Sequence, residues 1–233
     1  MRTAMLLLVF ERILLPIAFP GEIEGAFGTR WRSEVLLFHD GSTVAEYCPQ
    51  DCPVHPRGMV RIEPPLSDTL PSLGAFLHVT SPDDMRFTAL LHDQSRAGDN
   101  AGTEMPVVRA RDYRHRIVLP RVPLRGDFRV TLRIYGEGEA PQDVRVRMYR
   151  LDRLEPFVDT NVHLEGIVTA VPNPYPPYPA FAILPDLVRT YPVLEAAASA
   201  RVEIEAANEG EKIWAFASIT NNATQVVTTI TPQ

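Results

Sequence analysis

Long apolar runs, lysine and the common catalytic motifs are scarce or absent in this 233-residue chain. The longest apolar run, residues 4–10, is too short to span a bilayer as a helix, so no membrane span is expected. No GxSxG, HExxH, P-loop, GxGxxG or CxxC pair occurs, which argues against the enzyme classes that carry these motifs. The net charge of −6 gives no support to nucleic-acid binding. The chain is therefore expected to be neither an enzyme nor a nucleic-acid-binding protein.

Proline, in contrast, is abundant, at 22 of 233 residues. This is about twice the usual ~5%, and proline is tolerated at turns and at strand ends and edges but not inside helices. Apolar and polar residues alternate most clearly over 126–150, on either side of the breaker GEGEAPQ. A period of two places the apolar side chains on one sheet face and the arginines on the other. The simplest interpretation is an antiparallel hairpin with a long loop, whose dry face a second sheet must cover.

Further strands are predicted along most of the chain. Pro16 is expected to make the first of them an edge or a bulged strand. The turns HDGS (39–42) and SPDD (81–84) suggest hairpins, and NNAT (221–224) the last turn. The predicted strands are 12–19, 31–39, 43–48, 59–63, 75–80, 85–92, 107–122, 157–171, 201–206, 212–220 and 225–231.

The sequence thus predicts an all-β protein, a two-layer antiparallel β-sandwich of immunoglobulin-like or jelly-roll-like type. One short helical segment is expected near 186–200, where Pro192 confines it to two pieces. We expect a single domain over 11–233, with a boundary near 94–106 as the alternative. Residues 1–10 are either the remnant of an export signal or an apolar arm before the first strand.

The two cysteines, Cys48 and Cys52, are close in sequence. A disulfide that closes a turn is the favoured interpretation, and it fits an oxidising compartment. The alternative is a metal site that adds His55 and His39, although C-x3-C without a second cysteine pair is a poor zinc signature.

The longest polar gap, 93–105, has two interpretations. It is either a surface loop or a calcium loop that uses hard oxygen ligands, although its spacing matches no EF-hand. The candidate ligands are Asp93, Asp99, Asn100 and Glu104. No cofactor is expected other than calcium at this loop.

The segment NPYPPYPAF at 173–181 favours extended, polyproline-like backbone. Its rings, Tyr175, Tyr178 and Phe181, either lie over the core or form a stacking strip for a glycan or a peptide. The arginines of 126–150 likewise have two interpretations. Arg129, Arg133, Arg145 and Arg147 either bind an anionic partner or are solvated and paired with nearby carboxylates.

Two segments carry a resemblance to a known family. GAFGTRWRSEVLLFH (25–39) is similar to an opening of the form PGxxGxxWxSxLxLxN, and KIWAFASITNNATQVVTTITPQ (212–233) is similar to a closing pair of strands. The chain thus resembles an uncharacterised family of exported bacterial immunoglobulin-like β-sandwich domains. The resemblance implies the fold and export, and it carries no catalytic residue. His39 departs from the pattern, since a turn asparagine is usual there.

These observations lead to two functional hypotheses. The first is a non-enzymatic module, secreted, periplasmic or at the cell surface, with a structural or adhesive role and with itself or other surface proteins as partners. In one version it self-assembles by strand addition, with the apolar N-terminal arm completing a neighbour's sheet. The alternative is a glycan-binding module, assisted by calcium.

Overall fold

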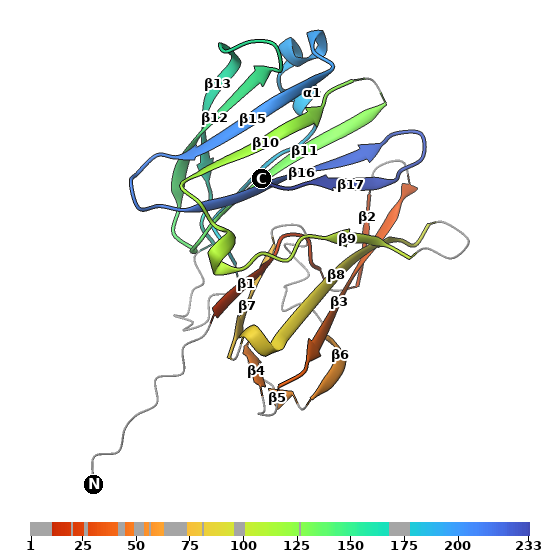
Figure 1. Ribbon diagram of the computed structural model, residues 1–233. Coiled ribbons are helices and arrows are strands. Elements are labelled where there is room, and N and C mark those ends of the chain that lie inside the picture. Colours follow the sequence, from red (N-terminus) through yellow and green to blue (C-terminus); the bar gives the residue numbers. More distant parts are fainter. Residues whose placement is uncertain are drawn as a thin grey trace.

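The computed structural model describes residues 11–19, 21–25, 28–41, 45–48, 54–55, 57–62, 74–80, 82–95, 101–125, 127–167 and 178–233, with backbone only at 45–48 and 54–55. The regular secondary structure of these residues is almost entirely antiparallel strand, so the predicted all-β sandwich architecture is confirmed. The strands form four sheets rather than two, and the sheets come in two pairs along the chain (Figure 1). We call residues 11–105 the N-terminal half and residues 116–233 the C-terminal half.

The N-terminal half contains sheets I and II. Sheet I has the order β1 (Glu11–Leu15), β7 (Ala75–Val79), β4 (Ala45–Cys48), β5 (Val54–His55). Sheet II has the order β2 (Glu22–Glu24), β3 (Arg30–His39), β8 (Met85–Asp93), β9 (Thr103–Met105), and β6 (Gly58–Ile62) also pairs with β3. β1 ends its sheet, as Pro16 predicted.

The C-terminal half contains sheets III and IV. Sheet III has the order β10 (Arg116–Pro123), β15 (Ser199–Ala206), β12 (Gln142–Arg150), β13 (Pro156–Leu164). Sheet IV has the order β14 (Phe181–Leu184), β11 (Phe128–Gly136), β16 (Ile213–Asn221), β17 (Val227–Ile230).

Helix is confined to short pieces. α1 (Leu187–Thr190) is followed by a 3-10 turn at Pro192–Ala196, which confirms the two short pieces expected around Pro192. Two further 3-10 turns, Pro82–Asp84 and Ala110–Asp112, lie in connections. Within the described ranges no helix has the length and apolar character needed to cross a membrane.

Three predicted hairpins are wrong, although their strands exist. β11 and β12 lie in sheets IV and III, so segment 126–150 crosses the sandwich instead of folding back within one sheet. The pairs β3–β4 and β7–β8 are likewise divided between sheets I and II. A period of two identifies the side chains that share a face, but it does not identify the neighbouring strand. Only the last turn, at 221–224, joins two adjacent strands as the sequence suggested, β16 and β17.

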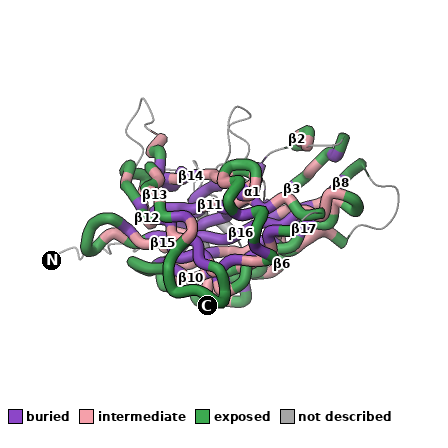
Figure 2. The backbone as a smooth tube through the Cα atoms, turned by 90° about the horizontal axis from the view of Figure 1, so that it is seen from above, coloured by how far each residue is buried: buried purple, intermediate pink, exposed green. Residues whose placement is uncertain are grey.

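The two halves are joined by one continuous apolar core. Figure 2 shows buried residues along the strands and exposed ones mainly in the connections. Leu14 and Val108 exchange two backbone hydrogen bonds of 2.8 and 3.0 Å, which covers the edge of β1 with the connecting segment. The Tyr135 hydroxyl donates a hydrogen bond of 2.7 Å to the Pro16 carbonyl oxygen, across the two halves. The halves therefore form one packed body. Along the chain, sheets I and II end at β9, close to the alternative domain boundary near 94–106.

The register of sheet IV explains this junction. Tyr135 lies opposite Trp214, and Arg133 lies opposite Phe216, on the face that points away from sheet III. Tyr135, Trp214 and Phe216 are all at most 4% exposed, and their rings follow one another at centroid distances of 6.3 and 5.3 Å. An outer sheet face carries such rings only if something covers it. Pro16 and Gly74 of the N-terminal half lie against Tyr135, and the connecting segment 106–114 lines a hollow together with Trp214.

Gly74 provides a test of this close approach. Its φ is +84°, and a Cβ there would lie 3.0 Å from the Tyr135 ring and 3.3 Å from the Leu15 carbonyl oxygen. We expect Gly74→Ala to lower the free energy of unfolding by about 2–3 kcal/mol, through backbone strain and the contact with Tyr135. Gly210→Ala is the matched control, because φ is +94° but the space is open; it should cost only about 1 kcal/mol. Equal losses in urea denaturation would contradict the close approach of the halves at Gly74.

Candidate functional site

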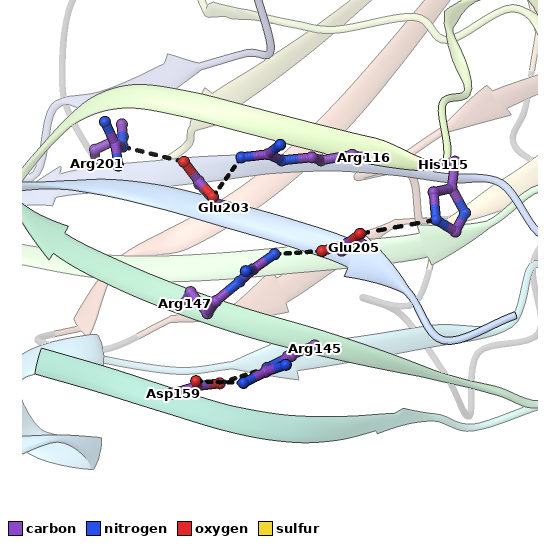
Figure 3. A network of polar contacts seen from close by, with 8 residues as sticks. All are labelled: His115, Arg116, Arg145, Arg147, Asp159, Arg201, Glu203 and Glu205. Atoms are coloured by element: carbon purple, nitrogen blue, oxygen red, sulfur yellow. Dashed lines mark hydrogen bonds and ion pairs between the residues drawn. The ribbon is translucent and has the colours of Figure 1, made fainter. Parts of the chain in front are cut away.

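The outer face of sheet III carries a cluster of paired charges, which we call the ion-pair cluster (Figure 3). It forms because polar residues alternate with buried ones on β12 and β15. Most of its pairs lie diagonally across neighbouring strands, where long side chains reach one another, and Arg201 pairs with Glu203 along β15 itself. The members are His115, Arg116, Arg145, Arg147, Asp159, Arg201, Glu203 and Glu205.

Glu203 is the most buried member, with a side chain only 7% exposed. Its carboxylate accepts a hydrogen bond of 2.7 Å from Arg116 and lies 3.2 Å from Arg201. The hydrogen bond that Arg116 donates to Glu203 raises the pKa of Arg116. Glu205 in turn pairs with Arg147 and lies 3.9 Å from His115. The carboxylates of β15 are thus compensated by arginines on both neighbouring strands, which is the arrangement that a buried charge requires.

Arg145 and Asp159 form a two-pronged pair, with N–O distances of 2.8 and 2.7 Å. The hydrogen bond from Arg145 lowers the pKa of Asp159 below its ordinary value of 3.8. This pairing is the geometry in which a guanidinium recognises a carboxylate best.

The Arg145–Asp159 pair predicts a dependence on acid. Because the pKa of Asp159 is lowered by folding, its stabilisation is present above the ordinary pKa and is lost as the pH falls through the lowered value. Asp159→Asn should therefore be less stable than wild type at pH 7 and should approach it below pH 3.8. The measurement is the urea midpoint at both pH values, with Asp152→Asn in an exposed turn as control. A difference that persists unchanged in acid would contradict the pairing.

The predicted single arginine face is wrong. Arg145 and Arg147 lie on the outer face of sheet III, whereas Arg129 and Arg133 belong to β11 in sheet IV. The physical reason is the connection 137–141, which carries the chain from one sheet to the other. For Arg145 and Arg147 the carboxylate pairing expected as one alternative is present.

A polar depression of about 610 Å³ lies beside the ion-pair cluster. Its lining includes His115, Asp143, Asn161, His163 and Glu205. His163 Nδ1 is 2.7 Å from the Asp143 carboxylate, but both side chains are at least 60% exposed. Within the described part of the chain, no three His, Cys, Asp or Glu side chains lie close enough to hold a metal ion.

A second hollow, of about 350 Å³, lies between the two halves, and we call it the inter-half cleft. One wall comes from the N-terminal half and is apolar: Ile17, Phe19, Ile23, Trp31 and Leu91. The opposite wall is the polar end of the outer face of sheet IV: Arg129, Thr131, Arg133, Ser218 and Thr220. Val227, Pro185 and Asp186 complete the lining. Sequence reasoning missed this site, because its members come from segments between residues 17 and 227.

The structure does not bring the described calcium candidates together. Asp93 is 5% exposed and accepts hydrogen bonds from the Ser95 backbone (3.0 Å) and hydroxyl (2.5 Å). Glu104 lies opposite Leu90, three residues before Asp93, so the register puts the two carboxylates on opposite faces of sheet II. Asp99 and Asn100 lie outside the described residues, and calcium stays a prediction.

The two described residues of the predicted stacking strip, Tyr178 and Phe181, expose little surface. Tyr178 is 8% exposed, and Phe181, the first residue of β14, packs against the core. Tyr175 lies outside the described residues. The two rings that can be followed thus match the interpretation in which they cover the core.

The predicted disulfide also stays a prediction. Cys48 is the last residue of β4, but its side chain is not described, and Cys52 lies outside the described residues.

Comparison with known proteins adds no further assignment: no protein-family model, curated protein or solved structure matches the chain.

Proposed function

We propose that the chain is a non-enzymatic module, exported or at the cell surface, with a structural or adhesive role. The observation that carries the proposal is the junction of the two halves, in which Tyr135 of sheet IV is fully buried and hydrogen-bonded to Pro16 of the N-terminal half. A shared core and the hydrogen bond from Tyr135 to Pro16 across the junction join the two sandwiches into one stiff body. Stiffness over two sandwich units is what a spacer or a presenting surface needs.

The ion-pair cluster adds a second support. Its arginines and carboxylates pair with one another over short distances on the sheet surface. In such pairs the aliphatic parts of the arginine side chains cover the sheet while the guanidinium groups stay solvated. Each exposed pair contributes little stability. Such a surface suits a protein outside the cell at high ionic strength. Salt screens the exposed ion pairs there, and the stability supplied by the apolar core is retained.

The proposal is tested by locating the protein and removing it. Intact cells of the producing organism are labelled with an antibody against the chain, and attachment to a surface is compared between cells with and without the gene. We expect labelling of intact or outer-membrane-permeabilised cells and weaker attachment or a softer envelope without the gene. A protein found only in the cytoplasmic fraction would overturn the proposal.

Self-assembly by strand addition is a version of this proposal, and β13 is its acceptor edge. β13 ends sheet III, runs over nine residues, and exposes Asp159, Asn161 and His163. An edge strand presents unpaired backbone groups with which another strand can pair. The donor is the apolar segment 1–10, and its deletion must stop before Glu11, because Ile13, Leu14 and Leu15 are fully buried.

Sedimentation velocity at increasing concentration tests the assembly. Wild type should form larger species, and both deletion of 1–10 and Asn161→Lys, which places a charge on the β13 edge, should restore the monomer. Asp83→Lys, at an exposed position in the N-terminal half, is the control and should still assemble. A wild-type protein that stays monomeric at high concentration removes the assembly version and leaves the structural role in place.

A further inference from the structure

We propose that the inter-half cleft binds a small amphipathic anion, a molecule with an apolar body and a single carboxylate. At about 350 Å³ the cleft is at the small end of the range of ligand sites, ~300–1,000 Å³. Its position between two packed units, with an apolar wall and a few convergent polar groups, is typical of small-molecule sites.

The apolar wall is fixed before any ligand arrives. Ile23 lies opposite Trp31 in the register of β2 and β3, so both side chains face the same side of sheet II. The Trp31 indole N–H donates a hydrogen bond of 2.9 Å to the Thr29 hydroxyl, which holds the ring in place. A rigid, half-buried tryptophan offers a large apolar contact at a small cost in conformational entropy.

A second anchor holds the segment that carries Ile17 and Phe19. The Ser33 hydroxyl accepts a hydrogen bond of 2.9 Å from the Phe19 N–H and donates one of 2.8 Å to the Phe19 carbonyl oxygen. Ser33 is 7% exposed, so both bonds are shielded from water. This end of the cleft is thus tied to β3 by side chain and backbone together.

The opposite wall supplies the charge. Arg129, Thr131 and Arg133 project from one face of β11, and the register places Thr220 and Ser218 opposite Arg129 and Thr131. Two guanidinium groups and three hydroxyls therefore face an apolar wall. Asp186 is the one carboxylate that lines the cleft, so the described lining carries more positive than negative charge. A guanidinium binds a carboxylate with two parallel hydrogen bonds, which makes an anionic head group the best match.

The two non-glycine residues with positive φ among those described lie at or near the cleft: one lines it, and the other contacts an arginine of the polar wall. Asp186 (φ 45°) lines the cleft, and Gln225 (φ 53°) accepts a hydrogen bond of 3.5 Å from Arg129. The left-handed region costs a residue with a side chain of order 1 kcal/mol or more, and such strain gathers at binding sites. Asp186 also lines a neighbouring hollow of about 440 Å³ together with Arg129, Arg125 and Arg189. Arg125 and Arg189 thus lie near the cleft, in a hollow that shares Arg129 and Asp186 with it.

Calorimetric titration of the full chain with octanoate tests the proposal, with octan-1-ol and octylammonium as probes of the same apolar body. We expect one octanoate to bind per chain. Octan-1-ol should bind at least tenfold more weakly than octanoate, and octylammonium should not bind. Arg129→Gln or Arg133→Gln should weaken octanoate binding at least tenfold, and Trp31→Ala should abolish it. Arg145→Gln is the control on sheet III, and it should leave the affinity unchanged.

The variants are first compared with wild type by circular dichroism, and Thr131→Val replaces any that does not fold; it should weaken octanoate at least twofold. Equal affinity for octanoate and octan-1-ol would overturn the anionic head group. No saturable binding, or binding that survives Trp31→Ala and both arginine substitutions, would overturn the site. None of these results bears on the proposed structural role, which is tested by location and attachment.

Discussion

Replacing Tyr135 by alanine should lower the free energy of unfolding by about 3–5 kcal/mol, the usual cost of deleting a fully buried aromatic ring. The side chain is completely buried although it points away from its own sandwich. It packs at 6.3 Å from the Trp214 ring, and its hydroxyl bonds to Pro16 in the other half. The loss therefore falls on the junction, and urea denaturation followed by circular dichroism measures it.

Two further variants separate the parts of this effect. Tyr135→Phe keeps the ring and leaves the Pro16 carbonyl oxygen without its donor, which should cost about 1–2 kcal/mol. Leu154→Ala removes a side chain that is 89% exposed and should change stability by less than about 0.5 kcal/mol. If Tyr135→Ala behaved like Leu154→Ala, the ring would not be buried between the halves.

A steep loss of stability in alkali is the second large effect. Burial raises the pKa of both Tyr113 and Tyr135 above the ordinary value of 10.0. For Tyr135 the guanidinium of Arg133 opposes the shift without cancelling it. Both phenols stay protonated in the folded protein and ionise on unfolding. Their stabilisation is complete below pH 10.0 and is lost as the pH rises towards the raised values, at about 1.4 kcal/mol per pH unit for each tyrosine.

The measurement is the urea midpoint at several pH values above 10.0, together with the absorbance of tyrosinate. Wild type should lose roughly 2.7 kcal/mol per pH unit from these two groups. Tyr113→Phe and Tyr135→Phe should each remove about half of that slope. Tyrosinate absorbance from all seven tyrosines at pH 11 in a protein that is still folded would contradict the burial of both phenols.

The sequence predicted the secondary structure better than the pairing of strands. Alternation over 128–136 and 142–150 correctly identified β11 and β12, because a period of two is a local property. Their assignment to one hairpin failed because the neighbours of a strand in a sandwich are set by how two sheets close over a core. No feature of GEGEAPQ distinguishes a turn within a sheet from a crossing between sheets.

The junction did leave a signal in the sequence. Residues 213–217, IWAFA, are continuously apolar rather than alternating, and every one of them is buried. A continuously apolar strand is covered on both faces, so this segment already required a third layer beyond a two-sheet sandwich. β7, with all five residues buried, gives the same indication.

The candidate sites were harder to predict. The carboxylate partners of Arg145 and Arg147 lie 14 and 58 residues away in the sequence, and they come together only through the order of sheet III. The inter-half cleft depends in addition on how the halves pack. Trp31 and Arg129 belong to different sandwiches, so no local pattern could place them across one hollow.

Differential scanning calorimetry of the whole chain tests most directly whether the two sandwiches share one core. We expect a single endotherm whose calorimetric and van't Hoff enthalpies agree, since the junction couples both halves. Two separable transitions, or a calorimetric enthalpy well above the van't Hoff enthalpy, would contradict the shared core.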